Sequence, residues 1–274
     1  MLIRAGYAIS IQCDVETPLM ALLSIHPSRA ASLRTPAIIT SDGPAPLVGS
    51  LDVFGNVRTR TIAPAGIINL SSSFIVEDSG LPDEVAPFAE EVGVAVLPEE
   101  AVNFLAGSRY CETDRLSPLA WSLFGGAPHG FQRVQAIVDY VHTRLTFGYR
   151  FARPTRTAWE AHEERVGVCR DFAHLAVAFC RCMNIPARYA TGYLGDIGVP
   201  PVDAPMDFSA WFEAYVGGRW YTFDARHRTP RIGRILMARG RDAADCAITT
   251  SFGQSKLVKF QVTTEEVASV SSAA

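Results

Sequence analysis

The sequence lacks three features that would place it in a specialised class of protein. Its 274 residues contain six cysteines, which are too few and too irregularly spaced for a disulfide framework. No run of 18 or more apolar residues occurs, so a membrane-spanning helix is not expected. Neither sign of charge dominates, because 25 Lys and Arg stand against 28 Asp and Glu. This balance gives no overall reason to expect a nucleic acid or a membrane as partner. The sequence does not indicate which oligomeric state the protein has.

The first residues of the sequence are not expected to act as a secretory leader. The apolar stretch there is broken by Gly6, Ser10 and Gln12, and it runs into Asp14 and Glu16. We therefore expect reduced thiols and a cytoplasmic location.

What is present is the composition of a folded globule. Hydrophobic residues make up 48% of the chain, charged residues 19% and aromatic residues 10%, which excludes a disordered, collagen-like or coiled-coil protein. A chain of this length forms one large domain or two small ones.

The first ninety or so residues alternate as strands do. Short β-branched or aromatic segments at 7–11, 19–25, 37–40, 51–54 and 67–76 are bounded by turn residues. Gly55 and Asn56 tolerate the positive φ of a hairpin turn. The sequence predicts a β-rich N-terminal domain over residues 1–95, with a structural or docking role because it carries no titratable cluster.

Helices followed by strands are expected in the rest of the chain. After an acidic, proline-punctuated connection at 82–100, the apolar spacing predicts helices at 131–145, 157–164 and 169–183. Strands are expected at 187–194, 210–216 and 220–223, the last two joined by a tight turn at Gly217 and Gly218. This order favours an α+β fold with a core over residues 96–262. Residues 263–274 are small and polar and are expected to form a flexible tail.

Cys169 is the strongest candidate for a reactive group. It follows Gly167 at the predicted start of a helix, where unpaired N–H groups and the helix dipole favour a thiolate. Cys180 and Cys182 lie inside an apolar stretch and are expected in the core. Their spacing along the helix does not suit a zinc site, so no metal is expected.

At this point the sequence resembles a known family. The run from Gly167 to Leu175, Gly-Val-Cys-Arg-Asp-Phe-Ala-His-Leu, is similar to that of the transglutaminase-like, papain-related cysteine enzymes of bacteria. Segments 184–189, 207–215 and 218–224 continue the match in order and spacing. The resemblance covers about residues 134–252, and the residues from Asp52 to Asn56 weakly resemble the β-rich region that often precedes that core.

The resemblance implies a papain-like core, in which a Cys-bearing helix packs on an antiparallel sheet, and a Cys-His-Asp site that needs no cofactor. Cys169 matches the nucleophile and Asp224 the carboxylate that orients the histidine. The histidine itself does not match, because Ser209 stands in its place and a serine cannot act as general base at neutral pH.

His227 is the better substitute base among the remaining histidines. It lies three residues after Asp224, where the strand is expected to end, so its side chain could enter the cleft or remain on a surface turn. His174, five residues after Cys169, is expected to face away from the thiol as a buried, hydrogen-bonded histidine.

Two further sets of residues have both a functional and a structural interpretation. Trp159, Trp211 and Trp220 could line a substrate groove or pack in the core. The arginines between 226 and 241 are expected to form a solvated turn face or to pair internally with Asp242, Asp245 or the acidic segment near Glu90, rather than to bind nucleic acid.

The sequence therefore leads to two hypotheses. The first is thiol-dependent acyl chemistry, hydrolysis or transfer, on a protein or peptide amide through a Cys169 thioester. The second is a catalytically impaired binding or scaffold module, which keeps the cleft but has lost the base because Ser209 replaces the expected histidine.

Overall fold

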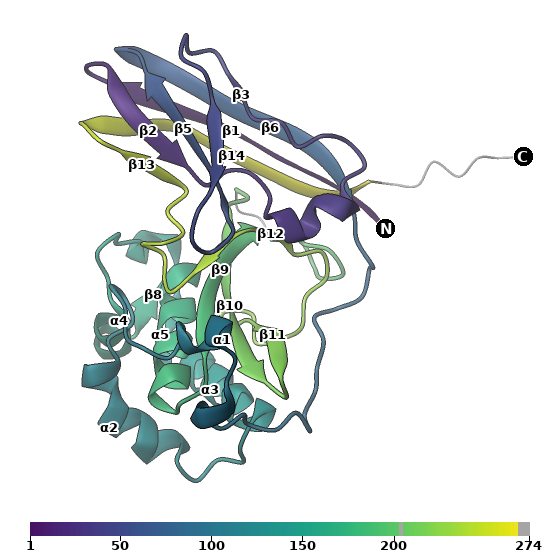
Figure 1. Ribbon diagram of the computed structural model, residues 1–274, viewed down its shortest axis with the longest axis vertical. Coiled ribbons are helices and arrows are strands. Elements are labelled where there is room, and N and C mark those ends of the chain that lie inside the picture. The colour runs from purple at the N-terminus through teal and green to yellow at the C-terminus, as the bar shows by residue number, and fades with distance from the viewer. Residues whose placement is uncertain (203–204, 268–274) are drawn as a thin grey trace, which may run out of the picture.

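A computed structural model describes residues 1–202 and 205–267 as a β-sheet region beside a helical region with its own sheet (Figure 1). The combination of helices with antiparallel sheets confirms the predicted α+β class. Within the described ranges, none of the helices has the length and apolarity that crossing a bilayer requires.

Two four-stranded sheets form the β-rich region. One has the order β14-β1-β6-β3 and the other β13-β2-β5-β4. Their strands are β1 (Leu2–Cys13), β2 (Thr17–Ala21), β3 (Thr40–Ser41), β4 (Val48–Leu51), β5 (Val57–Ala63), β6 (Gly66–Glu77), β13 (Thr249–Ser251) and β14 (Ser255–Val267). Buried side chains alternate along β6, and Ile68 and Phe74 of β6 share an apolar core with Ile3 and Ile9 of β1. This alternation is the pattern expected for sheets with one buried face.

The C-terminal strand corrects the predicted tail. Residues 263–267 belong to β14, which pairs antiparallel with β1 from Leu2↔Val267 to Cys13↔Ser255. The two strands lie side by side in Figure 1. Backbone pairing fixes these small polar residues, although they carry little apolar surface of their own. Residues 268–274 of the predicted tail lie outside the described residues.

The predicted turn at Gly55 joins β4 and β5, and it is longer than two residues. Asp52 Oδ1 accepts the N–H groups of Phe54 at 2.8 Å and Asn56 at 2.9 Å, and Gly55 has a φ of 80°. The Asn56 side chain bonds both the N–H and the carbonyl of Arg239 in β12 (Ile235–Gly240), each at 2.9 Å. The turn therefore docks the β-rich region onto the core sheet.

The helical region surrounds α5 (Cys169–Cys182), whose residues from Asp171 onward are buried. The helices α2 (Thr113–Phe124), α3 (Phe131–Arg144) and α4 (Ala158–Glu164) pack against it. Its other side packs on the sheet β11-β10-β9-β12. That sheet contains β9 (Ala187–Tyr193), β10 (Ser209–Val216) and β11 (Arg219–Phe223). The helices predicted at 131–145, 157–164 and 169–183 are confirmed to within two residues.

Several short elements connect these parts. The acidic segment after β6 runs down the side of the core in Figure 1 and contains η2 (Val94–Val96) and α1 (Glu99–Val102). The others are η1 (Pro27–Ser32), η3 (Tyr149–Phe151), β7 (Thr146–Phe147) and β8 (Val166–Gly167). β7 and β8 pair in parallel directly before α5. This pairing ties the segment that carries Tyr149 to the start of the helix.

Candidate active site

Cys169 is the first residue of α5, as the sequence predicts. Of the six cysteines, it is the one that keeps partial exposure, whereas Cys13, Cys111, Cys180, Cys182 and Cys246 are buried. The backbone N–H of Ala210, at the start of β10, points to its sulfur and lowers the pKa of the thiol. The start of α5 and the start of β10 therefore meet at this thiol.

The thiol pKa differs from the low value that a helix N-terminus favours. Burial raises the pKa of Cys169 from 9.0 to about 11, with Arg226 and the Ala210 N–H lowering it and the charges of Asp207 and Asp224 raising it. The packed surroundings of the thiol outweigh the helix dipole in this state, because losing water penalises the anion. The resting thiol is therefore protonated at neutral pH.

Ser209 lies directly before Ala210 and starts β10. It is 5% exposed, and its hydroxyl has no hydrogen-bond partner among the described residues. Its carbonyl accepts a bond from Thr191 Oγ1 at 2.9 Å. Ser209 is therefore next to the residue that contacts the thiol, but it brings no group that could take a proton from it.

Asp224 and His227 form a pair. Asp224 Oδ2 lies 2.8 Å from His227 Nδ1, while Asp224 Oδ1 accepts the N–H groups of Arg226 and His227 at 3.0 Å each. Arg234 Nη2 donates to Oδ2 at 2.9 Å. Burial raises the pKa of Asp224, but Arg234 and His227 more than offset this, and the net pKa lies well below its usual value. Asp224 is therefore an anion that holds the His227 ring in place through Nδ1.

A cavity of about 450 Å³ adjoins these groups. Its polar lining includes Tyr149, Asp207, Ser209, Arg226 and His227. Phe147, Leu194, Met206 and Phe208 supply apolar surface. The cavity lies near the thiol, because Ser209 in its lining directly precedes Ala210, whose N–H points to the Cys169 sulfur. Burial raises the pKa of Asp207 and that of the Tyr149 hydroxyl.

The three tryptophans do not line one groove. Trp159 lies under the Arg115 guanidinium at 4.5 Å, Trp211 is buried with Arg234 at 5.0 Å, and Trp220 stacks with Arg188 at 3.9 Å. Trp220 pairs with Tyr215 near the far end of the β10–β11 hairpin, roughly 20 Å along the strand from Ser209. It borders a separate cavity of about 850 Å³. None of the three lines the cavity beside Ser209, as far as the structure describes the chain.

His174 and the arginine run have structural roles. His174 is fully buried, its Nε2 accepts the Ala243 N–H at 3.1 Å, and burial lowers its pKa. Most arginines of the run form ion pairs within the protein: Arg228–Asp139, Arg231–Asp196, Arg234–Asp83, Arg234–Asp224, Arg239–Glu213 and Arg241–Asp245. Internal pairing is therefore confirmed for this run. Its partners are mostly other carboxylates than those expected, because the fold brings them from distant segments.

Sequence reasoning missed three groups near the thiol. Arg226 lies 3.8 Å over the ring of Phe147 and bonds the Tyr149 hydroxyl, and Asp207 borders the same cavity. Arg226 was concealed within a basic run, although its position two residues after Asp224 could have singled it out. In residues 1–202 and 205–267, no group of three or more His, Cys, Asp or Glu side chains is placed to hold a metal ion.

Comparisons with known proteins agree with this geometry. Residues 118–225 match the transglutaminase-like superfamily. A solved structure from Cytophaga hutchinsonii, described as a "Putative Cysteine Protease", is 30% identical with a TM-score of 0.81. The similarity covers 97% of this chain and 90% of that one.

Two mycobacterial relatives are similar in sequence. An uncharacterized protein of Mycobacterium tuberculosis strain H37Rv is 27% identical over 225 residues, which cover 74% of this chain and 70% of that protein. An uncharacterized protein of Mycobacterium leprae is 38% identical over 88 residues, or 30% of each chain, so the match spans less than a third of that relative. The extent of the structural match and the family match over the core together show that this chain belongs to the transglutaminase-like superfamily.

Proposed function

We propose that the protein is a thiol enzyme that hydrolyses or transfers the acyl group of a protein or peptide amide through a Cys169 thioester. The observation that supports this most is the partly exposed Cys169 at the start of α5, near a cavity lined by His227, whose ring is held by Asp224. A nucleophile, an oriented imidazole and an open space for a substrate are the components that acyl transfer requires.

The proposed chemistry begins with the protonated thiol. His227 Nε2 takes the Cys169 proton, directly or through one water, as the sulfur attacks the amide carbonyl carbon. The imidazolium then gives this proton to the leaving amine, and the acyl group remains on sulfur as a thioester. Water or a second amine attacks the thioester, which releases acid or a new amide and returns the proton to the thiolate. Asp224 stabilises the imidazolium throughout.

The N–H of Ala210 has a further part in this scheme. It already points to the sulfur, which lies at the N-terminus of α5. Such donors stabilise negative charge on the sulfur and on a nearby carbonyl oxygen during attack. The positive charge of Arg226 acts in the same direction on the sulfur.

A second candidate is a binding or scaffold module without turnover. Two observations favour it: Ser209 stands where the base is expected, and burial raises the pKa of Cys169 to about 11. In this case the cavity would bind a peptide segment without cleaving it. For both candidates we place the protein in the cytoplasm, in keeping with six cysteines that form no disulfide.

The first experiment measures which thiol reacts. The native protein is treated with limiting iodoacetamide across a pH series, and the labelled cysteines are located by peptide mass spectrometry. We expect Cys169 to label fastest, because the other five thiols are buried. Faster labelling of Cys13, Cys111 or Cys246 in the folded protein would refute Cys169 as the nucleophile.

A second experiment separates the two candidates. Wild-type protein and His227→Ala are assayed on a panel of amides and peptides, with His129→Ala as control because the His129 side chain is 72% exposed. We expect His227→Ala to abolish turnover and His129→Ala to leave it unchanged. A wild-type protein that labels at Cys169 but turns over no member of the panel would favour the binding module.

A further inference from the structure

The first turn of α5 is held by a carboxylate from its own third residue. Asp171 is 1% exposed, and its Oδ2 accepts the N–H of Val168 at 2.9 Å. A side chain at position 167 would prevent this, because a Cβ there would lie 2.6 Å from the Asp171 Cβ. Gly167 therefore makes room for Asp171 to fold back over the residue that precedes Cys169.

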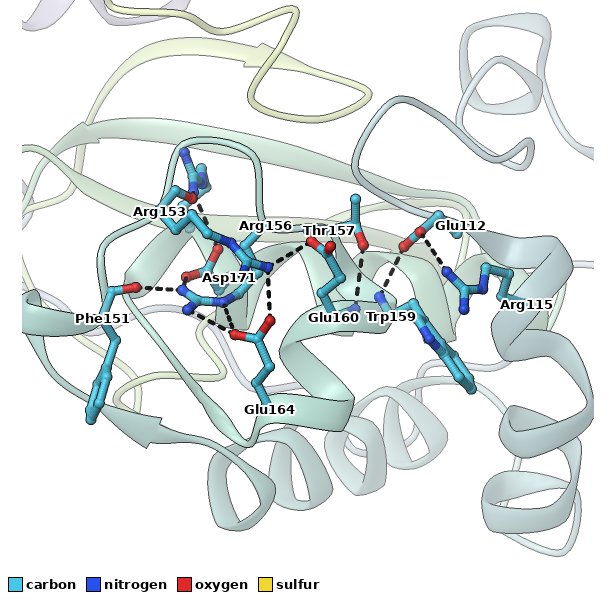
Figure 2. A network of polar contacts seen from close by, with 11 residues as sticks. Glu112, Arg115, Phe151, Arg153, Arg156, Thr157, Trp159, Glu160, Glu164 and Asp171 are labelled. Carbon is cyan, nitrogen blue, oxygen red and sulfur yellow. Dashed lines mark hydrogen bonds and ion pairs between the residues drawn. The ribbon is translucent and has the colours of Figure 1, made fainter.

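Arg156 neutralises this buried carboxylate and connects it to two other segments. Its Nη1 donates to Asp171 Oδ2 at 3.1 Å and to the carbonyl of Phe151 at 2.5 Å, and its Nε and Nη2 lie 3.0 Å from Glu164 Oε2. Figure 2 shows the guanidinium between these three partners. The Arg156 side chain is 5% exposed, so this is a desolvated contact rather than a surface ion pair.

The segment that Arg156 bonds at Phe151 also forms the wall of the cavity. Phe151 ends η3, the short helix that contains Tyr149, which lines the cavity near Cys169. The Gly148 N–H donates to the Gly167 carbonyl at 3.1 Å, which gives the same wall a second link to the start of α5. One guanidinium thus fixes both the cavity wall and the turn that carries the thiol.

An outer part of the network lies nearer to solvent. Arg153 bonds Glu160 and Glu164 at 2.8 Å each, and its side chain is 39% exposed (Figure 2). It does not contact Asp171. The chain therefore offers a matched control, because Arg153→Ala removes a side chain that makes no ion pair with Asp171 and keeps the Arg153 carbonyl, which accepts a bond from Arg170 in the first turn of α5.

We propose that Arg156 and Asp171 are positioning residues that set the nucleophilicity of Cys169. They hold the first turn of α5 so that the Cys169 sulfur stays against the Ala210 N–H at the start of β10, and they keep the cavity wall against that turn. This inference rests on the proposed role of Cys169 as the reactive thiol. Neither residue touches a substrate in this scheme.

Loosening the first turn of α5 is expected to raise the pKa of Cys169. When the turn loosens, the sulfur is no longer fixed against the Ala210 N–H and the N-terminus of α5, so the thiolate loses stabilisation and the pKa of Cys169 rises. The interaction of a group with the end of a helix shifts a pKa by about half a unit to one unit. The thiolate fraction at a fixed pH then falls by about three- to tenfold.

The test measures the alkylation rate of Cys169 against pH in the full chain. The variants are Arg156→Lys, Asp171→Asn and the milder Glu164→Gln, with Arg153→Ala as control and far-UV circular dichroism to select folded variants. A lysine keeps the charge of Arg156 but cannot bond Phe151, Glu164 and Asp171 together. We expect the pH midpoint to rise by about half a unit to one unit in Arg156→Lys and Asp171→Asn, and less in Glu164→Gln.

Arg153→Ala is expected to label within twofold of the wild type. If Asp171→Asn does not fold, the other two variants decide the question, since they leave the carboxylate in place. Folded variants whose pH profile for Cys169 coincides with that of Arg153→Ala would overturn the proposal. A wild-type protein in which another cysteine labels first would instead refute the function proposed for Cys169, so the two failures are distinguishable.

Discussion

Position 209 has a small hydroxyl where the resemblance to the family predicts an imidazole. The Ser209 Oγ is buried without a partner in the described part of the chain, next to the residue whose N–H points at the Cys169 sulfur. Asp224 directly follows Phe223, which pairs with Phe212 three residues along β10 from Ser209. A carboxylate and a thiol therefore flank this position, and a cavity of about 450 Å³ opens beside it.

Substituting Ser209 by histidine tests whether a general base is what the site lacks. If it is, Ser209→His adds a base next to Cys169 that Asp224 can orient, and amidase or transamidase activity rises by the ~10²–10⁴ typical of general-base catalysis. If His227 already serves, the same substitution changes turnover little. The measurement is the rate on an amide and peptide panel, with and without His227→Ala.

The Ser209 comparison also needs a control variant. Ser209→Ala is the control, and we expect it to change the free energy of unfolding by less than about 1 kcal/mol, because it removes a hydroxyl that makes no hydrogen bond. No gain in Ser209→His and no loss in His227→Ala, with an inert wild type, would leave the binding module as the function.

Asp224 is expected to make stability depend on pH. Its pKa is lower in the folded protein than the ~3.9 of an unfolded aspartate, despite burial, because of Arg234 and His227. Its contribution is therefore complete above about pH 5 and is lost as the pH falls through 4 towards the lowered value. Asp224→Asn should cost about 3–5 kcal/mol at pH 7, because it leaves Arg234 buried without this partner.

Urea unfolding of wild type and Asp224→Asn at pH 7, 5 and 4 checks this expectation. The difference in unfolding free energy should be the same at pH 7 and 5 and smaller at pH 4. A difference that grows on acidification would contradict the lowered pKa of Asp224.

At the scale of elements, the start of α5 depends on close packing. A methyl group at position 167 would lie 2.6 Å from the Asp171 Cβ and 2.8 Å from its Oδ2. Gly167→Ala should therefore displace the carboxylate and destabilise the protein by about 1–3 kcal/mol. Gly49→Ala in β4 is the control, because a Cβ there meets nothing within 4 Å.

Thermal and urea unfolding of both alanine variants give the comparison. We expect Gly49→Ala to change stability by no more than about 0.5 kcal/mol. Equal stability of the two variants would show that the first turn of α5 adjusts around the added methyl group.

Elements with a local signal could be predicted from the sequence, and those fixed by distant partners could not. The 3.6-residue period gave α3, and Gly217 with Gly218, at φ of 59° and 80°, gave the β10–β11 hairpin. β12 was concealed because it lies within the run of arginines, and β14 was concealed by a polar end that resembles a frayed terminus. The pairing of β14 with β1 joins residues far apart in the sequence and leaves no short-range pattern, so the periodicity of the sequence does not reveal this pairing.

The same division applies to the candidate site. Cys169 and Asp224 could be placed by motif, and the His227 turn by its distance from Asp224, whose Oδ1 in fact accepts the N–H groups of that turn. The raised pKa of the thiol depends on its packing against β10, and the effect of Arg226 depends on the turn that follows β11. No spacing of residues in the sequence encodes either contact. The prediction that the three tryptophans line one groove was wrong for the same reason, because each packs against an arginine that the fold brings from another segment.

At the scale of the whole molecule, the β-rich region and the core share an apolar cluster, and one buried polar side chain adds a further link between them. Asn56 is fully buried and bonds both backbone groups of Arg239 in β12. Asn56→Ala leaves those two groups without partners, so it should destabilise the protein by about 2–4 kcal/mol. Asn103→Ala is the control, since Asn103 is exposed and bonds a single carbonyl at 3.3 Å.

Differential scanning calorimetry of the two asparagine variants tests this joint. We expect a lower transition temperature in Asn56→Ala and an unchanged one in Asn103→Ala. A thermal transition that separates into two steps in Asn56→Ala would show that the β-rich region and the core unfold independently once the contact between Asn56 and Arg239 is lost.

The pairing of β1 with β14 has a consequence for how the chain is made. Arg4 and Glu265, which face each other across these strands, are 261 residues apart in the sequence. On the ribosome, β1 emerges long before β14, because the whole core is translated between the two strands. The edge of β1 must therefore remain open until β14 emerges, and a nascent chain stalled before β14 would expose a strand able to recruit another polypeptide.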